Sequence, residues 1–133
     1  MDRREVASQL RAMNYNCAQS VFCSMEDLTE VDRDLGLTIT ESLGGGFRCG
    51  EICGALSGAI IGATFTCKAK GKFGLRDETV KKIVNEITAE FKEREGHIAC
   101  RDLLASSEVK LCGRYIADGA EIAEKVLKEN GII

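Results

Sequence analysis

Residues 49–65 read CGEICGALSGAIIGATF, a stretch in which small residues recur at every fourth position. Two such series run through it, namely Gly54, Gly58 and Gly62, and Ala55, Ala59 and Ala63. On an α-helix, residues four apart share a face, so the two series form a smooth stripe that allows close packing. The apolar run contains Glu51 and is shorter than the roughly 20 residues that a membrane span needs. We therefore predict a buried central helix from about Cys49 to Phe65.

Apolar residues at helical spacing also occupy both flanks of this stretch. The expected helical segments cover residues 2–13, 17–25, 31–35, 77–96, 100–104 and 108–131. Asp2, Asn16 and Asp77 are the expected N-caps, and the glycines at 44–46 predict a tight turn before the central helix. No segment shows the alternation of apolar and polar residues that is typical of a β-strand. The sequence therefore predicts an all-α fold, a compact bundle of about five main helices around the Gly/Ala-rich central helix, with residues 1–133 forming a single cysteine-rich helical domain.

The amino-acid composition and the net charge of the chain limit the kinds of molecule that it is expected to bind. The chain of 133 residues is 44% hydrophobic, which suffices for a core, and its net charge of -3 provides no large positive field for a phosphate backbone. We therefore expect no nucleic acid and no membrane as partners. The first five residues mix acids with bases and precede no apolar signal region, which favours a cytoplasmic location. In that compartment thiols are kept reduced, so abundant cysteine points to metal ligation or catalysis before structural disulfides.

Seven cysteines are the composition's one sharp anomaly, and no Cys-x-x-Cys pair occurs among them. Cys49 and Cys53 stand four apart, a spacing that on a helix puts two sulfurs on one face, where they can share a metal or, with backbone distortion, form a bond. Cys17 and Cys100 fall near expected helix N-termini, where unpaired N–H groups stabilise a thiolate.

Several residues also have a purely structural interpretation. Free cysteine often packs as a small hydrophobe, and Cys112 and Cys67 fit that description on their helices. Cys23 lies six positions from Cys17 and points to a different helix face. His97, the single histidine, could bind a metal or move protons, but a surface role is the more common one for a lone histidine in a polar turn.

Three stretches resemble the C_GCAxxG_C_C family, whose members are described as redox-active. They are Tyr15-Asn16-Cys17-Ala18-Gln19-Ser20-Val21, the run from Gly44 to Ala59, and Cys100-Arg101-Asp102-Leu103-Leu104 followed by Cys112. The resemblance implies that the family's cysteines are Cys17, Cys53, Cys100 and Cys112, with Gly54, Ala55 and Gly58 completing the motif. Cys23, Cys49 and Cys67 look like additions. A related cysteine-rich region beside the haem domains of split-Soret cytochromes suggests an iron–sulfur cluster, whereas a Cys-x-x-Cys-His haem motif is absent from this chain.

Three hypotheses for function follow, with the first preferred. In the first, Cys17, Cys53, Cys100 and Cys112 are metal ligands, most simply of an iron–sulfur cluster that carries electrons, and Gly54 and Gly58 let the backbone come close to the cofactor. In the second, the same thiols are catalytic in a thiol/disulfide oxidoreductase or redox sensor without a cofactor, with Cys49 and Cys53 as a nucleophile and its resolving partner and the pairing of the other cysteines open. In the third, the chain is a non-enzymatic zinc-binding or interaction module. We expect a redox partner protein, and a homo-oligomer is left open.

Overall fold

The computed structural model describes residues 2–74 and 78–133, and this part of the chain is all-α, as predicted. It contains eight α-helices and no strand, and five of the helices have eight or more residues. Their bounds are α1 Arg3–Ala12, α2 Cys17–Cys23, α3 Glu26–Thr29, α4 Arg33–Thr40, α5 Gly54–Ala69, α6 Glu78–Glu95, α7 Cys100–Ala105 and α8 Cys112–Glu129. The N-caps expected at Asp2 and Asn16 are confirmed, and Asp77 lies outside the described residues.

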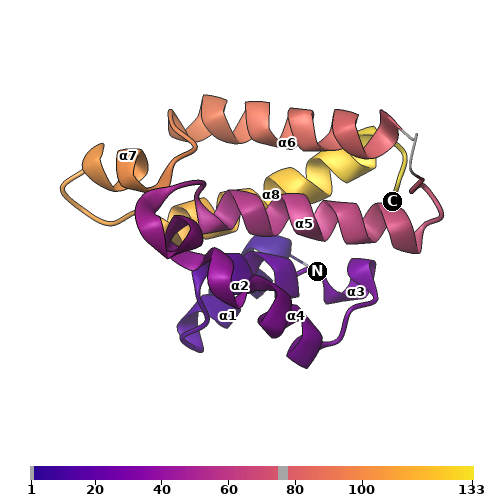
Figure 1. Cartoon of the computed structure of the whole chain (residues 1–133), viewed down its shortest axis with the longest axis horizontal. Helices are drawn as coiled ribbons and strands as arrows, with labels where there is room; N and C mark the ends of the chain where they lie inside the picture. The colour runs from indigo at the N-terminus through magenta and orange to yellow at the C-terminus, as the bar shows by residue number, and fades with distance from the viewer. Residues whose placement is uncertain (1, 75–77) are drawn as a thin grey trace.

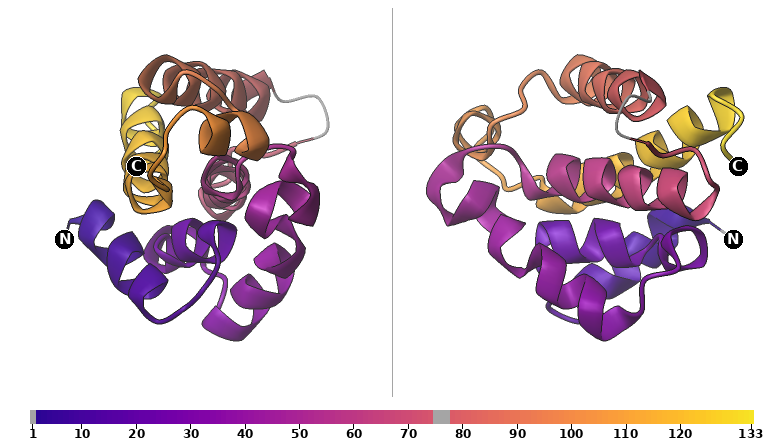
Figure 2. Two further views of the ribbon diagram at one scale, coloured as in Figure 1. Left: turned by 90° about the vertical axis from the view of Figure 1, so that its left-hand side faces the viewer. Right: turned by 45° about the vertical axis from the view of Figure 1, so that its right-hand side comes forward.

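Helix α5 is the central element, surrounded by α2, α6 and α8 when it is viewed end-on (Figure 2). Its small residues explain the close packing. A Cβ added to Gly58 would lie 2.7 Å from the carbonyl oxygen of Ala18 in α2. On the other side, a Cβ on Gly119 of α8 would lie 2.8 Å from the carbonyl oxygen of Ala55. Since real side chains do not tolerate such distances, only glycine lets the three backbones approach this closely.

The prediction that the central helix begins near Cys49 is wrong, because α5 begins at Gly54. The preceding residues form a tight irregular turn, η2, over Gly46–Gly50, in which the Glu51 N–H donates to the Gly46 carbonyl. Phe47 and Arg48 adopt the left-handed conformation there, with φ of 59° and 61°. Because of this backbone geometry, residues 46–53 do not continue the helix, although the four-residue spacing in the sequence extends back to Cys49.

Residues 26–40 also differ from expectation, since they form α3 and α4 in place of one short helix ending at Gly36. Asp32 caps α4 by accepting from the Leu35 N–H, and the helix continues through Gly36. The Gly36 position faces Cys23 and Phe22, whose nearest side-chain atoms would lie 3.1 Å from an added Cβ. Gly36 therefore serves a helix contact and does not end the helix.

Helix α1 runs antiparallel to α8, and ion pairs fix their register. Arg3 is buried and pairs with Glu124 of α8 and with Asp27 after α2, at 2.7 and 2.8 Å. One residue on, Arg4 pairs with Asp118 of α8. These contacts bring the C-terminal end of α1 to the beginning of α8, which starts at Cys112, four residues later than expected.

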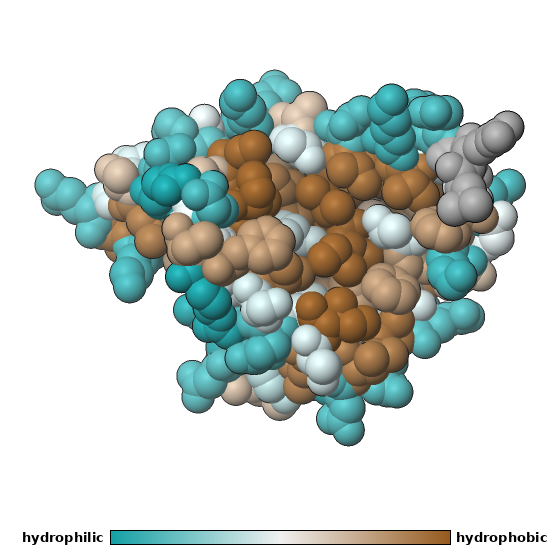
Figure 3. Space-filling view, in the orientation of Figure 1, coloured by the Kyte–Doolittle hydropathy of each residue, from teal (hydrophilic) through white to brown (hydrophobic). Residues whose placement is uncertain are grey.

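In the view of Figure 1, α6 lies above α5 and α8, and α1 to α4 lie below them. Helix α7 and the turn before α5 close one end of the molecule (Figure 1). Apolar side chains gather on the face of the molecule over α5 (Figure 3). Ile60, Ile61 and Phe65 of this helix are only partly buried. No helix among the described residues is long and apolar enough to cross a membrane.

A candidate thiol site where four helices begin

Four cysteines that are far apart in sequence line one small pocket at the closed end of the molecule. They are Cys17, Cys53, Cys100 and Cys112, and the remaining lining comes from Gly45, Gly54, Leu103, Leu104 and Tyr115. Each cysteine stands where a helix starts: three are the first residues of α2, α7 and α8, and Cys53 is the N-cap of α5. The free space among them is about 10 Å³, enough for about one water molecule. The site is therefore closely packed and lined mainly by sulfur and apolar atoms.

A short backbone pairing places Cys53 beside Cys100. Ile52 and Ala99 form an isolated antiparallel bridge. On either side of it, the Cys53 N–H donates to the Ile98 carbonyl at 2.8 Å, and the Cys100 N–H donates to the Glu51 carbonyl at 2.6 Å. In an antiparallel pair, residues 53 and 98 point to the same side, and so does residue 100, two positions on. The pairing therefore directs both thiols to the same side.

The other two thiols are placed by a helix cap and by close packing. Asn16 and Gln19 form a capping box, in which Asn16 accepts from the Gln19 N–H while Gln19 accepts from the Asn16 N–H. This cap fixes Cys17 in the first turn of α2. A Cβ on Gly54 would lie only 3.1 Å from the Cys17 Cβ, so α5 begins directly against it. Close contact between α5 and α8 at Gly119 brings in Cys112 from the opposite side.

The four thiols differ in acidity. A hydrogen bond with Cys17 lowers the pKa of Cys112 to about 6, overcoming the opposing effect of burial, and the positive charges of Arg11 and Lys110 lower it further. The same hydrogen bond, together with burial and the charge on Cys112, raises the pKa of Cys17. At neutral pH the pair therefore consists of a Cys112 thiolate that accepts a hydrogen bond from the Cys17 thiol.

The remaining two thiols stay protonated. Burial raises the pKa of Cys53 to about 11, although the backbone N–H groups of Ala55 and Leu56 act against it. Burial raises the pKa of Cys100 as well, and the neighbouring Cys112 adds to this shift. One anionic sulfur thus lies among three neutral ones, and this sulfur is the strongest nucleophile in the site.

The other cysteines lie apart from this pocket. Cys49, expected on one helix face with Cys53, is exposed in the irregular turn, and its thiol hydrogen bonds to the Gly46 carbonyl at 3.5 Å. Cys23 packs in a separate apolar cluster with Phe22, and Cys67 is buried in the main core. The shared helix face that motivated the Cys49–Cys53 pairing does not exist, because α5 starts after both residues.

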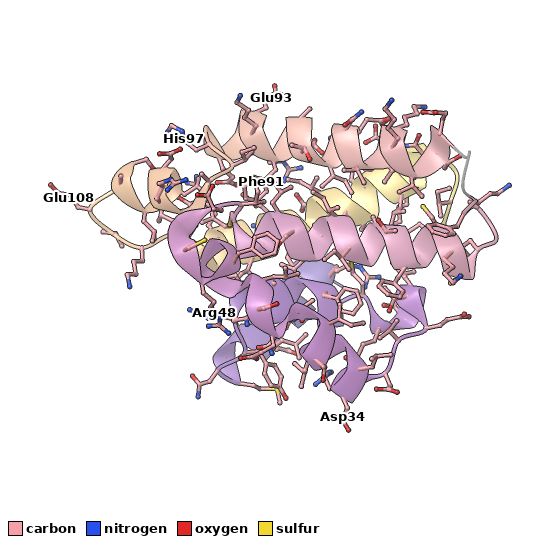
Figure 4. The ribbon with its side chains drawn as sticks, in the orientation of Figure 1. Asp34, Arg48, Phe91, Glu93, His97 and Glu108 are labelled. Carbon is pink, nitrogen blue, oxygen red and sulfur yellow. The ribbon has the colours of Figure 1, made fainter. Side chains whose placement is uncertain are left out.

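The charged neighbours singled out by sequence are at the surface. Glu51 is exposed and forms an ion pair with Arg101. Arg48, next to Cys49 in the sequence, pairs with Glu41 at 2.9 Å. His97 is exposed on the connection between α6 and α7 (Figure 4). None of these side chains lines the thiol pocket.

Gly54 and Gly58, expected to admit a cofactor, face α2. Added Cβ atoms would meet Ala18 and Cys17 at Gly54, and Ala18 alone at Gly58. The close backbone approach inferred from the sequence is therefore between two helices, and it positions Cys17 relative to Cys53. No cofactor is needed to explain it.

The pocket's fit to a metal can be judged from its donors and its space. Four cysteine sulfurs are a suitable donor set for zinc or an iron–sulfur cluster. Within residues 2–74 and 78–133, however, no group of three or more His, Cys, Asp or Glu side chains is arranged to hold a metal ion. The space of about 10 Å³ is too small for a cluster. In this arrangement the donors suit a metal, but the space does not admit a cluster unless the sulfurs separate.

Sequence reasoning missed two basic residues beside the thiols. Arg11 and Lys110 are the charged groups that lower the pKa of Cys112. Lys110 lies two residues before Cys112, so proximity in sequence was an available signal. Arg11 is 101 positions away, and only the antiparallel packing of α1 on α8 brings it close.

Comparison with known proteins gives one match. A family model described as "Putative redox-active protein (C_GCAxxG_C_C)" matches residues 15–126, which include all four pocket cysteines. No curated protein and no solved structure matches the chain significantly.

Proposed function

Since the chain belongs to the C_GCAxxG_C_C family, which is named for redox activity, we propose that its four-thiol pocket exchanges disulfides, with Cys112 as the nucleophile and Cys17 as its resolving partner. The observation that carries this proposal is the pocket that brings Cys17 and Cys112 together at the starts of α2 and α8. Their interaction lowers the pKa of Cys112 and raises that of Cys17. Disulfide exchange needs an attacking thiolate at ambient pH and a second sulfur within reach of it. Cys17 and Cys112 meet both requirements.

The proposed reaction transfers two electrons. The Cys112 thiolate attacks one sulfur of a substrate disulfide, which forms a mixed disulfide and releases one substrate sulfur as a thiolate. The Cys17 sulfur then attacks the Cys112 sulfur, which forms the Cys17–Cys112 disulfide and releases the second substrate sulfur. The proton of Cys17 goes to a released thiolate. The substrate disulfide is thus reduced to one thiol, which takes the proton of Cys17, and one thiolate, while the two cysteines are oxidised to a disulfide.

The pKa values of Cys17 and Cys112 determine which of the two thiols reacts first. Cys17 holds its proton while Cys112 is anionic, because the negative charge of Cys112 raises the Cys17 pKa. Once Cys112 has formed a mixed disulfide, it carries no charge, so this cause disappears and Cys17 loses its proton more easily. The resolving thiol is therefore activated only after the first step.

We further propose that a second dithiol returns the protein to its reduced form. A partner protein with a dithiol, or a small cellular thiol, would attack the Cys17–Cys112 disulfide in the reverse sense. The cytoplasm, with its thiol-reducing systems, is the compartment we expect for this cycle.

An iron–sulfur centre is the second candidate, because four thiols from four separate segments are the usual ligand number for such a cluster. Cys17, Cys53, Cys100 and Cys112 would hold it, and bound there it would supply one-electron transfer. Zinc on the same four thiols would instead give a closed structural site. We rank the cluster below disulfide exchange because of the space between the sulfurs, and zinc because no group of three or more His, Cys, Asp or Glu side chains in the described residues is arranged to hold a metal ion.

One purification separates these candidates. The protein is prepared anaerobically and analysed for iron, sulfide, zinc and visible absorption, and then oxidised with a small disulfide and mapped by mass spectrometry. Disulfide exchange predicts a colourless protein with a defined Cys17–Cys112 bond after oxidation. A brown protein with stoichiometric iron and sulfide would replace this proposal with the cluster. Scrambled disulfides across all seven cysteines would argue against a dedicated thiol pair.

A further inference from the structure

We propose that Arg11 and Lys110 form a cationic rim beside the thiol pocket, and that this rim selects disulfides carrying negative charge. This inference rests on the proposed disulfide exchange and names the class of its substrate. The class is defined by chemistry, as small or peptide disulfides with carboxylates close to the sulfur–sulfur bond.

Helix packing places Arg11 at this end of the molecule. Arg4 pairs with Asp118 of α8, and Arg11 follows Arg4 by seven residues, about two turns, so both side chains lie on the same face of α1. Because α1 and α8 are antiparallel, two turns along α1 correspond to two turns back along α8, from Asp118 to the region of Cys112. A hydrogen bond from the Arg11 guanidinium to the Tyr15 carbonyl, at 3.0 Å, holds the side chain toward the start of α2.

Lys110 supplies the second positive charge. It is exposed, and it stands two residues before Cys112 in the connection between α7 and α8. Glu108, the nearest acid in sequence, lies at the outer part of this connection, away from the body of the molecule (Figure 4). Lys110 and Arg11 therefore bring two positive charges toward the same thiol from different segments of the chain.

These two cations differ from the other basic residues of this end. Arg48 is paired with Glu41, and Arg101 is paired with Glu51, so each of those charges is already compensated. Across the described part of the chain, no ion pair involves Arg11 or Lys110. Their charge remains available to a ligand. Both charges lie near the reactive sulfur, Lys110 by its place two residues before Cys112 and Arg11 by the packing of α1 against α8.

The consequence for catalysis is electrostatic. An approaching carboxylate is attracted by uncompensated cations within about a Debye length, roughly 8 Å at physiological salt. Two such charges raise the encounter rate for anions and lower it for cations. Apart from the Cys112 thiolate, the residues that line the pocket carry no charge, and Leu104 among them is 41% exposed.

The experiment compares three small disulfides that differ in charge: dithiodiglycolate, which is dianionic, bis(2-hydroxyethyl) disulfide, which is neutral, and cystamine, which is dicationic. Oxidation rates of the reduced full-length protein are divided by those of dithiothreitol with the same disulfide, which removes intrinsic reactivity. We expect the corrected rate to be about tenfold higher for the anion than for the neutral disulfide at low salt, and lowest for the cation. This ratio should fall toward one as salt increases.

Variants assign the effect to the rim. Arg11→Gln and Lys110→Gln should each reduce the anion-to-neutral ratio about two- to threefold, whereas Arg11→Lys should retain most of it. Because the ratio is taken within one variant, any change in Cys112 acidity cancels. Lys82→Gln is the matched control, an exposed lysine near the start of α6, at the end of that helix away from the thiol site. Circular dichroism verifies that each variant is folded.

Two outcomes overturn different claims. If all three disulfides oxidise the protein at equal corrected rates, or if the ratio is unchanged in the double variant R11Q/K110Q, the cationic rim is wrong and disulfide exchange stands. If none of the three disulfides oxidises Cys17 and Cys112, the proposed function itself is wrong, and the proposal of a substrate-selecting rim is wrong as well.

Discussion

Removal of the Cys17 thiol should shift the alkylation profile of Cys112 by more than two pH units. In the native protein, the hydrogen bond from Cys17 is the largest cause of the low Cys112 pKa of about 6. In Cys17→Ala this bond is gone, and the pKa of Cys112 should return to about 8.5, the ordinary value of a cysteine. The Arg11 and Lys110 charges remain, so the midpoint can stay slightly below that value.

The size of the rate change depends strongly on pH. At about pH 5.5, a thiol of pKa 6 is about one-quarter ionised, whereas a thiol of pKa 8.5 is only about 0.1% ionised. This difference of about 240-fold is partly offset, because the more basic thiolate is about 13-fold more nucleophilic at a Brønsted slope near 0.45. The net loss is about 20-fold at that pH. At pH 7 the two effects nearly cancel, so the midpoint of the profile is the more reliable measurement.

The assay is iodoacetamide labelling at a series of pH values, with quantification of each cysteine by mass spectrometry. Tryptic cleavage after Lys110 and Arg114 yields residues 111–114, LCGR, which contain Cys112 alone. Cys23→Ala is the matched control, since Cys23 packs in a separate cluster and should leave the Cys112 midpoint unchanged. A native midpoint near pH 8.5, or one near 6 that persists in Cys17→Ala, would refute the proposed thiolate–thiol pair.

Three further predictions concern stability, each measured as the free energy of unfolding in urea. Gly58→Ala should destabilise the protein by about 1–3 kcal/mol, because its Cβ would lie 2.7 Å from the Ala18 carbonyl oxygen. The control is Gly113→Ala in α8, where an added Cβ has no atom within 4 Å, and this change should stabilise the protein by about 0.5–1 kcal/mol. Equal effects of the two changes would contradict the packing argument. The reduced protein should gain stability as the pH rises from about 6 toward about 7.5, since the depressed pKa of Cys112 means that the unfolded chain binds the extra proton in this range. At higher pH the raised pKa values of Cys17, Cys53 and Cys100 act in the opposite sense, because the unfolded chain releases those protons first. A flat profile in the lower range in the native protein, or the same slope in Cys112→Ala, would contradict the prediction. Glu95→Gln should leave the free energy of unfolding at neutral pH unchanged or higher, because burial and the interaction with Asp118 raise the pKa of Glu95 and make its charged form costly. Arg114→Gln, which removes the ion-pair partner of Glu95, is the comparison. If Glu95→Gln lowered the free energy of unfolding more than Arg114→Gln does, the Glu95 charge would be needed for stability.

The helical class and most helix positions could be predicted because they depend on local patterns. The caps at Asp2 and Asn16 and the apolar stripe of α6 are readable from a few neighbouring residues. The start of α5 could not be predicted in the same way. Residues 49–53 have helical spacing, yet the left-handed conformations at Phe47 and Arg48 and the bridge between Ile52 and Ala99 override it. That bridge is a contact between segments 47 residues apart, which periodicity does not encode.

The composition of the pocket was suggested by family resemblance, whereas the roles within it needed the fold. By sequence alone, Cys112 fitted a core position on an amphipathic helix, and its position at the start of α8 became visible only with the helix boundary. The pairing of Cys49 with Cys53 rested on a helix that does not extend that far. The choice of Cys17 as the partner of Cys112 depends on packing among α1, α2 and α8, and no spacing in the sequence indicates it.

The glycines connect the fold to the proposed chemistry. A Cβ added to Gly54, at the start of α5, would lie 3.1 Å from the Cys17 Cβ, and one added to Gly119 of α8 would meet Ala55. Because these contacts involve backbone atoms, a side chain at either position would move a whole helix start, and with it a sulfur. A hydrogen bond between two thiols does not survive a displacement of about 1 Å, so the low pKa of Cys112 depends on glycines that are not themselves reactive. Under the proposed function, the same small residues that allow the tight core therefore also hold the proposed nucleophile in place.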